Sequence, residues 1–173
     1  MRVSVKWLFP LALAALVLIP VAAQGQFAFD ENPLVGKQAL DFTLKTLSGQ
    51  TMSLNQYRQG SPAIIFFWAT WCPHCRDELK VLSRQSEDLQ RRGIKILLVD
   101  IEESPRQIHA LIDKYHFPFE VFLDEQSAIS DQYSIVGVPT LFFINKDGVV
   151  TSMEHELPEN YAELLKADFK KRS

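Results

Sequence analysis

The chain has 173 residues, enough for one ordinary domain and too few for two of typical size. It is 47% hydrophobic and 23% charged, a composition typical of a globular protein rather than a disordered or fibrous one. A formal net charge of −3 provides no basic surface, which argues against nucleic acid as a partner, and a count of two cysteines excludes a disulfide-rich scaffold.

The first 23 residues have the pattern of an export segment. Arg2 and Lys6 are followed by an uncharged run from Trp7 to Ala23 that ends in small residues. This pattern predicts a secretory signal over residues 1–23 that is removed after export. The run is slightly short of the roughly 20 residues that span a bilayer, so an uncleaved N-terminal membrane anchor is the alternative. In either case we expect an extracytoplasmic protein, in the periplasm or at the outer face of the inner membrane, with a tether over 24–34 and one domain over 35–173.

The first half of the domain alternates between strand and helix patterns. Asp41–Leu44 alternates polar and apolar residues, which predicts an outer strand. The continuous apolar run Ala63–Trp68 predicts a central strand buried on both faces. Apolar residues then recur every three or four positions from Cys75 to Leu89, which predicts a helix that starts at Pro73 and ends before Gly93.

The second half continues the alternation. The run Ile94–Ile101 predicts a second buried strand, and Ser104 with Pro105 provides a cap and a first-turn proline for a predicted helix to about Tyr115. Alternating strands and helices with a late hairpin predict a three-layer α/β sandwich. The other predicted elements are a strand at Phe119–Leu123, a short helix at Ser127–Tyr133, a strand at Thr140–Ile144, a hairpin return at Val149–Thr151 and a closing helix at Pro158–Lys171.

Two cysteines lie where the buried strand gives way to the helix, in the segment Trp-Cys-Pro-His-Cys at 71–75. A C-x-x-C pattern there puts Cys72 at the helix N-terminus, where free N–H groups and the helix dipole favour a thiolate. Pro73 suits the first helical turn because its missing donor costs little there. Cys75 belongs to the apolar stripe. We therefore expect an exposed attacking Cys72 and a buried resolving Cys75, the asymmetry that thiol–disulfide exchange requires.

His74 separates the two cysteines and bears on their chemistry. Its imidazolium would stabilise the thiolate and make the pair more oxidising, and the alternative is a solvated surface histidine without a role. A zinc site would need two further ligands, yet His109, His116 and His155 form no second paired motif. A purely structural disulfide across so short a loop would stabilise little. We therefore predict a redox-active dithiol, with no metal and no organic cofactor.

Three segments together resemble the extracytoplasmic thioredoxin-fold redoxins of the TlpA/ResA type. They are Gly36–Leu44, Trp71–Cys75 and the Gly-Val-Pro-Thr of Gly137–Thr140. The resemblance covers Val35 to Leu165 and includes the extra helix and strand, Ser104–Leu123, that distinguish this group from thioredoxin. It implies a thioredoxin-like three-layer sandwich, with a mixed central sheet and helices on both faces.

The resemblance also implies roles at the dithiol. Cys72 corresponds to the family's nucleophile and Cys75 to its resolving thiol. Glu78 corresponds to an acid that relays protons to the dithiol in this group, whereas thioredoxin's buried aspartate, six positions before the first cysteine, is replaced by Phe66. We expect Glu78 to handle protons, and the alternative is a solvated first-turn acid favoured by the helix dipole.

A partner-binding surface is implied by the same resemblance. Pro139 matches the proline whose preceding peptide bond is cis in this fold, and the backbone of Val138 would pair with an extended partner segment. Trp71 and Pro73 would complete this surface beside the dithiol. The alternative for Pro139 is an ordinary strand-opening proline.

These features predict an exported thiol–disulfide oxidoreductase that acts on the thiols and disulfides of partner proteins. Reduction is the favoured direction, with a membrane-linked electron donor and cytochrome c maturation as its context. Because the Pro-His dipeptide resembles that of DsbA-type oxidants, oxidation or isomerisation of secreted proteins is the alternative. A peroxiredoxin is less favoured because Ala69 and Ile65 stand where its Thr or Ser and its Pro would be. A copper-binding assembly protein is less favoured because such proteins space their cysteines more widely.

Overall fold

The computed structural model describes residues 32–167. The predicted export segment, most of the predicted tether and the last residues of the predicted closing helix lie outside this range. Within residues 32–167, every helix is too short or too polar to cross a membrane.

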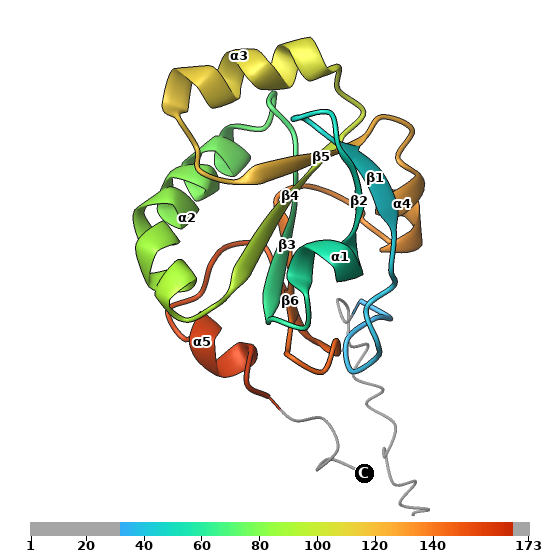
Figure 1. Cartoon of the computed structure of the whole chain (residues 1–173), viewed down its shortest axis with the longest axis vertical. Helices are drawn as coiled ribbons and strands as arrows, with labels where there is room; N and C mark the ends of the chain where they lie inside the picture. The colour runs from blue at the N-terminus through green and yellow to red at the C-terminus, as the bar shows by residue number, and fades with distance from the viewer. Residues whose placement is uncertain (1–31, 168–173) are drawn as a thin grey trace, which may run out of the picture.

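The described residues build one mixed sheet of seven strands, in the order β2-β1-β5-β4-β3-β6-β7 (Figure 1). The pairs β3–β4 and β4–β5 are parallel, and the other four neighbouring pairs are antiparallel. The strands are β1 (Thr43–Thr46), β2 (Thr51–Ser53), β3 (Ala63–Trp68), β4 (Lys95–Ile101), β5 (Glu120–Asp124), β6 (Thr140–Ile144) and β7 (Val150–Glu154).

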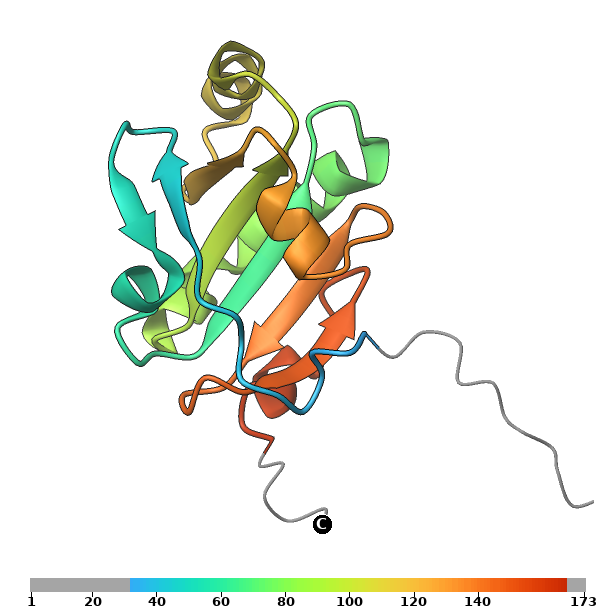
Figure 2. The same ribbon diagram turned by 90° about the vertical axis from the view of Figure 1, so that its right-hand side faces the viewer.

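Helices cover both faces of this sheet and make it the middle of three layers. Figure 2 shows α4 in front of the sheet and α2 behind it. Residues of α2, α3 and α5 share one apolar core, and residues of α1 and α4 share the other. The helices of the described part are α1 (Leu54–Arg58), α2 (Pro73–Arg91), α3 (Pro105–Tyr115), α4 (Ala128–Gln132) and α5 (Tyr161–Leu164).

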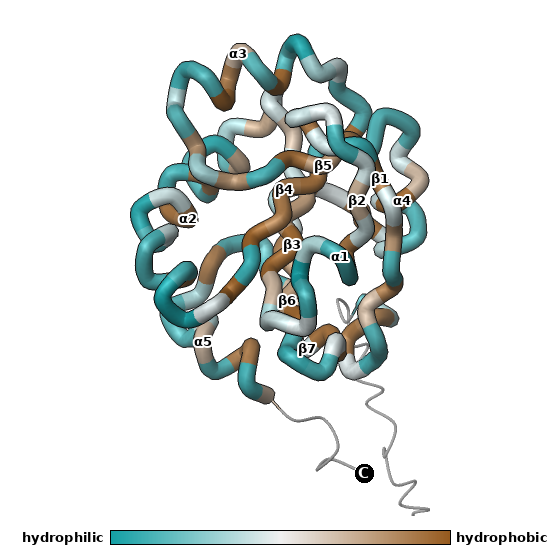
Figure 3. The backbone as a smooth tube through the Cα atoms, viewed as in Figure 1, coloured by the Kyte–Doolittle hydropathy of each residue, from teal (hydrophilic) through white to brown (hydrophobic). Residues whose placement is uncertain are grey.

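The central strand β3 is buried on both faces, which accounts for its unbroken apolar sequence. Phe66 and Trp68 pack on the side of α2, whereas Ile65 and Phe67 pack on the side of α4, and all four are fully buried. A strand between two helical layers has no solvent face, so polar alternation is absent. The central strands are accordingly the most hydrophobic part of the backbone in Figure 3.

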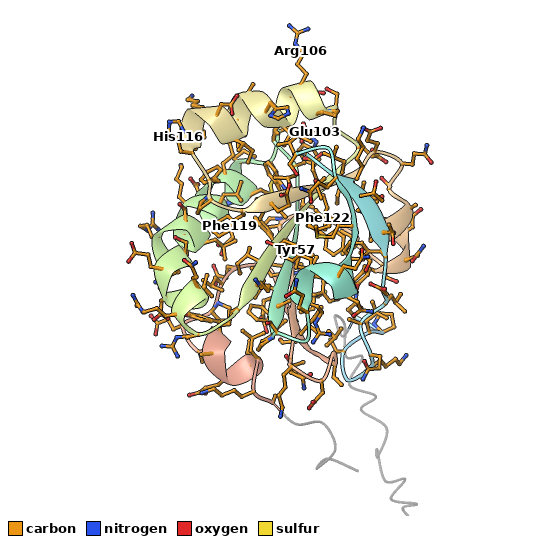
Figure 4. The ribbon with its side chains drawn as sticks, viewed as in Figure 1. Tyr57, Glu103, Arg106, His116, Phe119 and Phe122 are labelled. Atoms are coloured by element: carbon orange, nitrogen blue, oxygen red, sulfur yellow. A yellow bond between two sulfur atoms is a disulfide. The ribbon has the colours of Figure 1, made fainter. Side chains whose placement is uncertain are left out.

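The core beneath α1 is aromatic. The Tyr57 ring meets the Phe122 ring edge to face at a centroid distance of 5.4 Å, and both residues are labelled in Figure 4. The Tyr57 hydroxyl donates to the Ile96 carbonyl at 2.8 Å. Burial raises the pKa of Tyr57 to about 12, so this hydroxyl remains a donor at neutral pH.

The predicted elements of the middle of the chain are confirmed, and those near its ends need correction. The strands predicted at 63–68 and 140–144 have the predicted bounds, and the helix predicted from Pro73 ends at Arg91. The outer strand predicted at 41–44 instead covers Thr43–Thr46. Neither β2 nor α1 was among the predicted elements. The short α1 is set by a capping box, in which Ser53 and Gln56 each accept the other's backbone N–H.

The closing helix is much shorter than predicted. Of the described residues in the predicted range 158–171, only Tyr161–Leu164 is helical. Directly after it, Lys166 and Ala167 donate their N–H groups three residues back, which is a tighter pattern than an α-helix. The Asn145 side chain donates to the Ala167 carbonyl at 3.1 Å, so Ala167 is tied to the β6–β7 turn.

The chain enters the domain along the edge of the sheet. The Gly36 N–H donates to the Val150 carbonyl and the Ala39 N–H donates to the Gly148 carbonyl, both at 2.8 Å. Val150 pairs with Ile144, the last residue of β6. The entering segment is therefore attached at the end of the sheet where β6 finishes, not where it begins.

Candidate active site

Cys72 and Cys75 are joined by a disulfide at the start of α2, with their Cα atoms 5.3 Å apart. Cys72 is the N-cap residue of α2, and its Sγ accepts the Cys75 N–H at 3.1 Å. Pro73 is the first residue of the helix. The helix N-terminus therefore lies at the first sulfur, as the sequence predicted. A sulfur that accepts a backbone N–H is better stabilised as a thiolate than one without a donor.

The two sulfurs differ less in exposure than expected. Cys75 is fully buried, as predicted, but Cys72 is only 4% exposed, so the prediction of an openly exposed first cysteine is wrong for this oxidised form. The carbonyl oxygen of Val138 lies 3.6 Å from the Cys72 Sγ and covers it. The neighbouring Trp71 is 67% exposed and forms the prominent apolar surface beside the disulfide.

The loop that covers Cys72 contains the only cis peptide bond of residues 32–167, between Val138 and Pro139. The cis bond agrees with what the resemblance implied for Pro139. This cis-proline loop, residues 137–140, is closed by a hydrogen bond from the Thr140 Oγ1 to the Gly137 carbonyl at 2.8 Å, directly before β6 continues. Folding thus brings Val138 and Pro139 against Cys72, although 66 residues separate Val138 from this cysteine.

Glu78 lies one turn after Cys75 on α2 and is buried, with 8% of its surface exposed. Its Oε1 accepts the Leu157 N–H at 2.9 Å. Burial raises the pKa of Glu78 above its ordinary value, and the hydrogen bond from Leu157 offsets part of this shift. The alternative of a solvated first-turn acid is therefore wrong. The proton-handling role of Glu78 stays a prediction.

A groove of about 330 Å³ lies beside the disulfide, between α2 and the residues that follow β7. His74 and Glu78 face it from α2, and Pro139 faces it from the cis-proline loop. His155 and Glu156 form the opposite wall, and sequence reasoning did not assign either of them to the site. No pattern in the sequence links these two to the dithiol, since only the pairing of β6 with β7 brings them there.

Glu103 is another residue that sequence reasoning missed. It lies beside the start of α3, as Figure 4 shows, and is buried. Its carboxylate accepts both the backbone N–H and the Oγ1 hydroxyl of Thr70. Arg76 of α2 donates to the Thr70 carbonyl at 2.7 Å. The loop that leads into Cys72 is thus held from two sides.

Asp100, near the end of β4, was missed as well. It is 1% exposed, stands in register with Trp68 of β3, and neither of its carboxyl oxygens has a donor in hydrogen-bond geometry within the described part. Burial and the neighbouring Glu103 carboxyl raise the pKa of Asp100 to about 8. The signal was a lone acid inside the apolar run 94–101, which the strand prediction passed over.

Within residues 32–167 no three His, Cys, Asp or Glu side chains are grouped so that they could hold a metal ion.

Comparison with known proteins gives a family and a fold. The model of the AhpC/TSA family matches residues 35–153. The chain is 30% identical over 145 residues to the thiol-disulfide oxidoreductase ResA of Bacillus subtilis (strain 168). This match covers 81% of this chain and 80% of that protein. A relative of the same name from Bacillus anthracis is 30% identical over 86% of this chain and 84% of its own length.

Solved structures agree with the predicted fold. A secreted Mycobacterium tuberculosis disulfide oxidoreductase, homologous to E. coli DsbE, superposes with a TM-score of 0.60 at 25% identity, over 72% of this chain and 92% of its own. The thioredoxin domain of a thiol-disulfide oxidoreductase from Bacteroides vulgatus gives 0.67 at 23% identity, over 76% and 96%. The predicted thioredoxin-like fold class is thereby confirmed.

Proposed function

The chain belongs to the AhpC/TSA family and is a thiol–disulfide oxidoreductase, and from this premise we propose that it reduces disulfides of partner proteins through Cys72 and Cys75. One observation carries the proposal. A disulfide joins the N-cap cysteine of α2 to a fully buried cysteine one turn later, and a cis-proline loop covers the first sulfur.

The proposed reaction begins with the reduced pair. The Cys72 thiolate attacks one sulfur of the partner's disulfide, which forms a mixed disulfide and releases the other partner sulfur as a thiolate that takes up a proton. Cys75 then loses its proton and attacks the Cys72 sulfur. The second partner thiol leaves, and the Cys72–Cys75 disulfide remains. Two electrons pass to the partner, and the dithiol itself supplies both.

We assign the proton transfer of the second step to Glu78. Cys75 is fully buried, so its proton cannot pass directly to water. Glu78 is one helical turn away and also faces the open groove. Its raised pKa lets this carboxylate accept a proton closer to neutral pH than an ordinary glutamate would.

The partner's polypeptide is proposed to lie across the cis-proline loop. The Val138 backbone would pair with an extended segment, as a strand added to a sheet does, and this would place a partner disulfide at Cys72. Trp71 and Pro73 are both exposed beside the disulfide and would contact the same segment, with Pro139 at its other side.

We further propose that the protein is exported by residues 1–23 and works outside the cytoplasm. A cytoplasmic dithiol is recharged by soluble reductants, whereas an exported reductant needs a membrane-linked donor to return it to the reduced form. The N-terminal residues either are removed or anchor the domain at the membrane. Maturation of c-type cytochromes is the proposed context, because their haem attachment sites are Cys-x-x-Cys-His segments that must be reduced first.

Oxidation or isomerisation of secreted proteins is the second candidate, and His74 favours it. This histidine is exposed between the two cysteines, where a positive imidazolium would stabilise the Cys72 thiolate and thus the reduced form. A pair whose reduced form is stabilised is a stronger oxidant.

The reduction potential of the full chain in glutathione buffers decides between the two directions. A value of roughly −230 mV or lower is expected for the proposed reductant, and about −120 to −180 mV would support an oxidant or isomerase instead. His74→Ala should move the potential to a more negative value if His74 stabilises the thiolate, and His109→Ala, an exposed histidine on α3, is the matched control. Failure to form a reversible Cys72–Cys75 disulfide would contradict both candidates.

A further inference from the structure

The segment His155–Leu157, directly after β7, contacts both halves of the site. The His155 ring Nδ1 lies 2.8 Å from the carbonyl oxygen of Pro139, in the cis-proline loop. Two residues later, the Leu157 N–H donates to Glu78 on α2 at 2.9 Å. One short segment is therefore hydrogen-bonded to the loop that covers Cys72 and to the acid behind Cys75.

The contact with Pro139 fixes the chemistry of the His155 ring. A carbonyl oxygen can only accept a hydrogen bond, so Nδ1 must carry the hydrogen and donate it. In the neutral ring Nε2 is then the acceptor. The imidazole thus behaves as a fixed N–H donor to the loop.

The register of the sheet shows why a side chain takes this place. The ladder between β6 and β7 ends at the pair Leu141–Glu154. Beyond that pair the two chains separate, and no described backbone N–H reaches the Pro139 carbonyl. The His155 imidazole supplies the donor that the ladder no longer provides.

We infer that His155 is a positioning residue for the exchange reaction, whose imidazole holds the Pro139 carbonyl so that the adjacent Val138 backbone is presented to the partner polypeptide. The inference rests on the proposed function, because it concerns how a protein disulfide is seated. The Val138 carbonyl already lies 3.6 Å from the Cys72 sulfur, so a shift of this loop changes where a partner strand meets the reacting atom.

This role separates two kinds of substrate. A small aromatic disulfide needs access to Cys72 and no strand pairing. A polypeptide disulfide also needs the Val138 backbone in place. The Thr140 bond to the Gly137 carbonyl remains when His155 is changed, so the loop loses one of its restraints and keeps another.

The test compares single-turnover reduction of insulin disulfides with that of 5,5′-dithiobis(2-nitrobenzoate) by the full chain. The chain is reduced beforehand with dithiothreitol and freed of it, so that Cys72 and Cys75 supply both electrons. For His155→Ala we expect the KM for insulin to rise roughly three- to tenfold, the effect of one lost hydrogen bond. The ratio of kcat/KM for insulin to that for the small disulfide should fall by the same factor. His155→Asn should restore both, because the Asn amide nitrogen takes the position of the imidazole Nδ1. His109→Ala on α3 is the control and should change neither.

Two results would overturn the role of His155. One is an unchanged insulin KM in His155→Ala, and the other is an equal loss with both disulfides, which would mean an effect on the dithiol itself. If His155→Ala does not fold, a nitrogen-15 spectrum of the wild-type ring decides: hydrogen on Nδ1 supports the proposal, and hydrogen on Nε2 alone contradicts it. Wild-type protein that reduces neither disulfide would contradict the proposed function and not this assignment.

Discussion

Glu78 combines two properties that a proton carrier needs, burial next to Cys75 and a face on the groove. Its pKa lies above the ordinary carboxyl value because burial disfavours the charged form. The ionised form accepts the Cys75 proton, so the rate of the resolving step should rise with pH through this raised pKa. Glu78→Gln should slow that step about tenfold or more and remove this inflection.

The measurement is stopped-flow resolution of a mixed disulfide over a range of pH. Glu87→Gln is the matched control, since Glu87 is an exposed acid on the same helix and should leave the profile unchanged. If Glu78→Gln keeps both the wild-type rate and the wild-type pH profile, Glu78 has only a structural role.

Asp100 should make the folded protein less stable as the pH rises. In the unfolded chain this carboxyl ionises near its ordinary pKa of 3.8, whereas in the folded protein it stays protonated up to a pKa of about 8. Between these two pKa values the unfolded state binds fewer protons than the folded state, so the free energy of unfolding falls as the pH rises. The contribution of Asp100 to stability is complete only below the pKa of the unfolded chain. Asp100→Asn should remove this decline, which amounts to at most about 1.4 kcal/mol per pH unit.

Urea unfolding at pH 5 and pH 8 measures the effect. The difference in free energy of unfolding between Asp100→Asn and wild type should be more favourable to the variant at pH 8 than at pH 5. The reason is that the asparagine amide does not ionise and can donate to Glu103 without a charge. Asp113→Asn, an exposed position on α3, should leave the pH dependence as it is. A wild-type stability that is flat between pH 5 and pH 8 would show that Asp100 is ionised in the folded protein.

At the scale of elements, the loop between β3 and α2 depends on an acid from a different part of the chain. Thr70 and Glu103 are 33 residues apart in the sequence, yet Glu103 accepts both the N–H and the hydroxyl of Thr70. Thr70→Val removes the hydroxyl at nearly constant volume. It should lower the free energy of unfolding by roughly 1.5–3 kcal/mol, the range for a hydrogen bond to a charged group. It should also change the alkylation rate of reduced Cys72.

Thr151→Val is the control for that prediction. The Thr151 hydroxyl donates to the Phe143 carbonyl at 3.1 Å on β7, away from the disulfide. This variant should lose stability with an unchanged alkylation rate of reduced Cys72. Equal alkylation rates in both variants would mean that the Glu103 contact stabilises the loop without setting the position of Cys72.

The elements that the sequence predicted well are those with a strong local pattern. The run Ala63–Trp68 is apolar because both its faces are covered, and the stripe that includes Cys75 and Leu82 repeats at the helical period. The position of Cys72 at the start of α2 followed from these two patterns alone. By contrast, α1 has a single turn and depends on the Ser53 capping box, so it has too few residues to show a period.

The parts of the site that escaped prediction depend on contacts between distant segments. His155 reaches Pro139 only because β7 pairs with β6, and Leu157 reaches Glu78 across 79 residues. The burial of Cys72 has the same origin, since the carbonyl that covers it comes from the cis-proline loop. Residue type and spacing identify the dithiol, but the surroundings that tune it are set by tertiary packing.

At the scale of the whole molecule, the redox state and the stability of the fold are linked. For a reductant the folded protein favours the disulfide, so the oxidised form should unfold at a higher urea concentration than the reduced form. The two free energies of unfolding should differ by about 1.4 kcal/mol for each 30 mV between the reduction potentials of the folded and the unfolded protein. For an oxidant the order is reversed, because the folded protein then favours the thiolate.

Unfolding curves with and without dithiothreitol measure this difference. The double variant Cys72→Ser, Cys75→Ser should give the same curve under both conditions. A reduced form that is more stable than the oxidised form would contradict the proposed direction and support the oxidant.

The polarity of the sheet decides which way the disulfide faces. Gly36 and Ala39 join the sheet where β6 ends, and the cis-proline loop lies where β6 begins. Both ends of the described chain lie at the lower side of Figure 1, away from α3. The five residues of β6 separate the two poles by about 17 Å at 3.3 Å per residue. If the residues before Gly36 hold the domain at a membrane, the dithiol faces away from the lipid, toward whatever diffuses past.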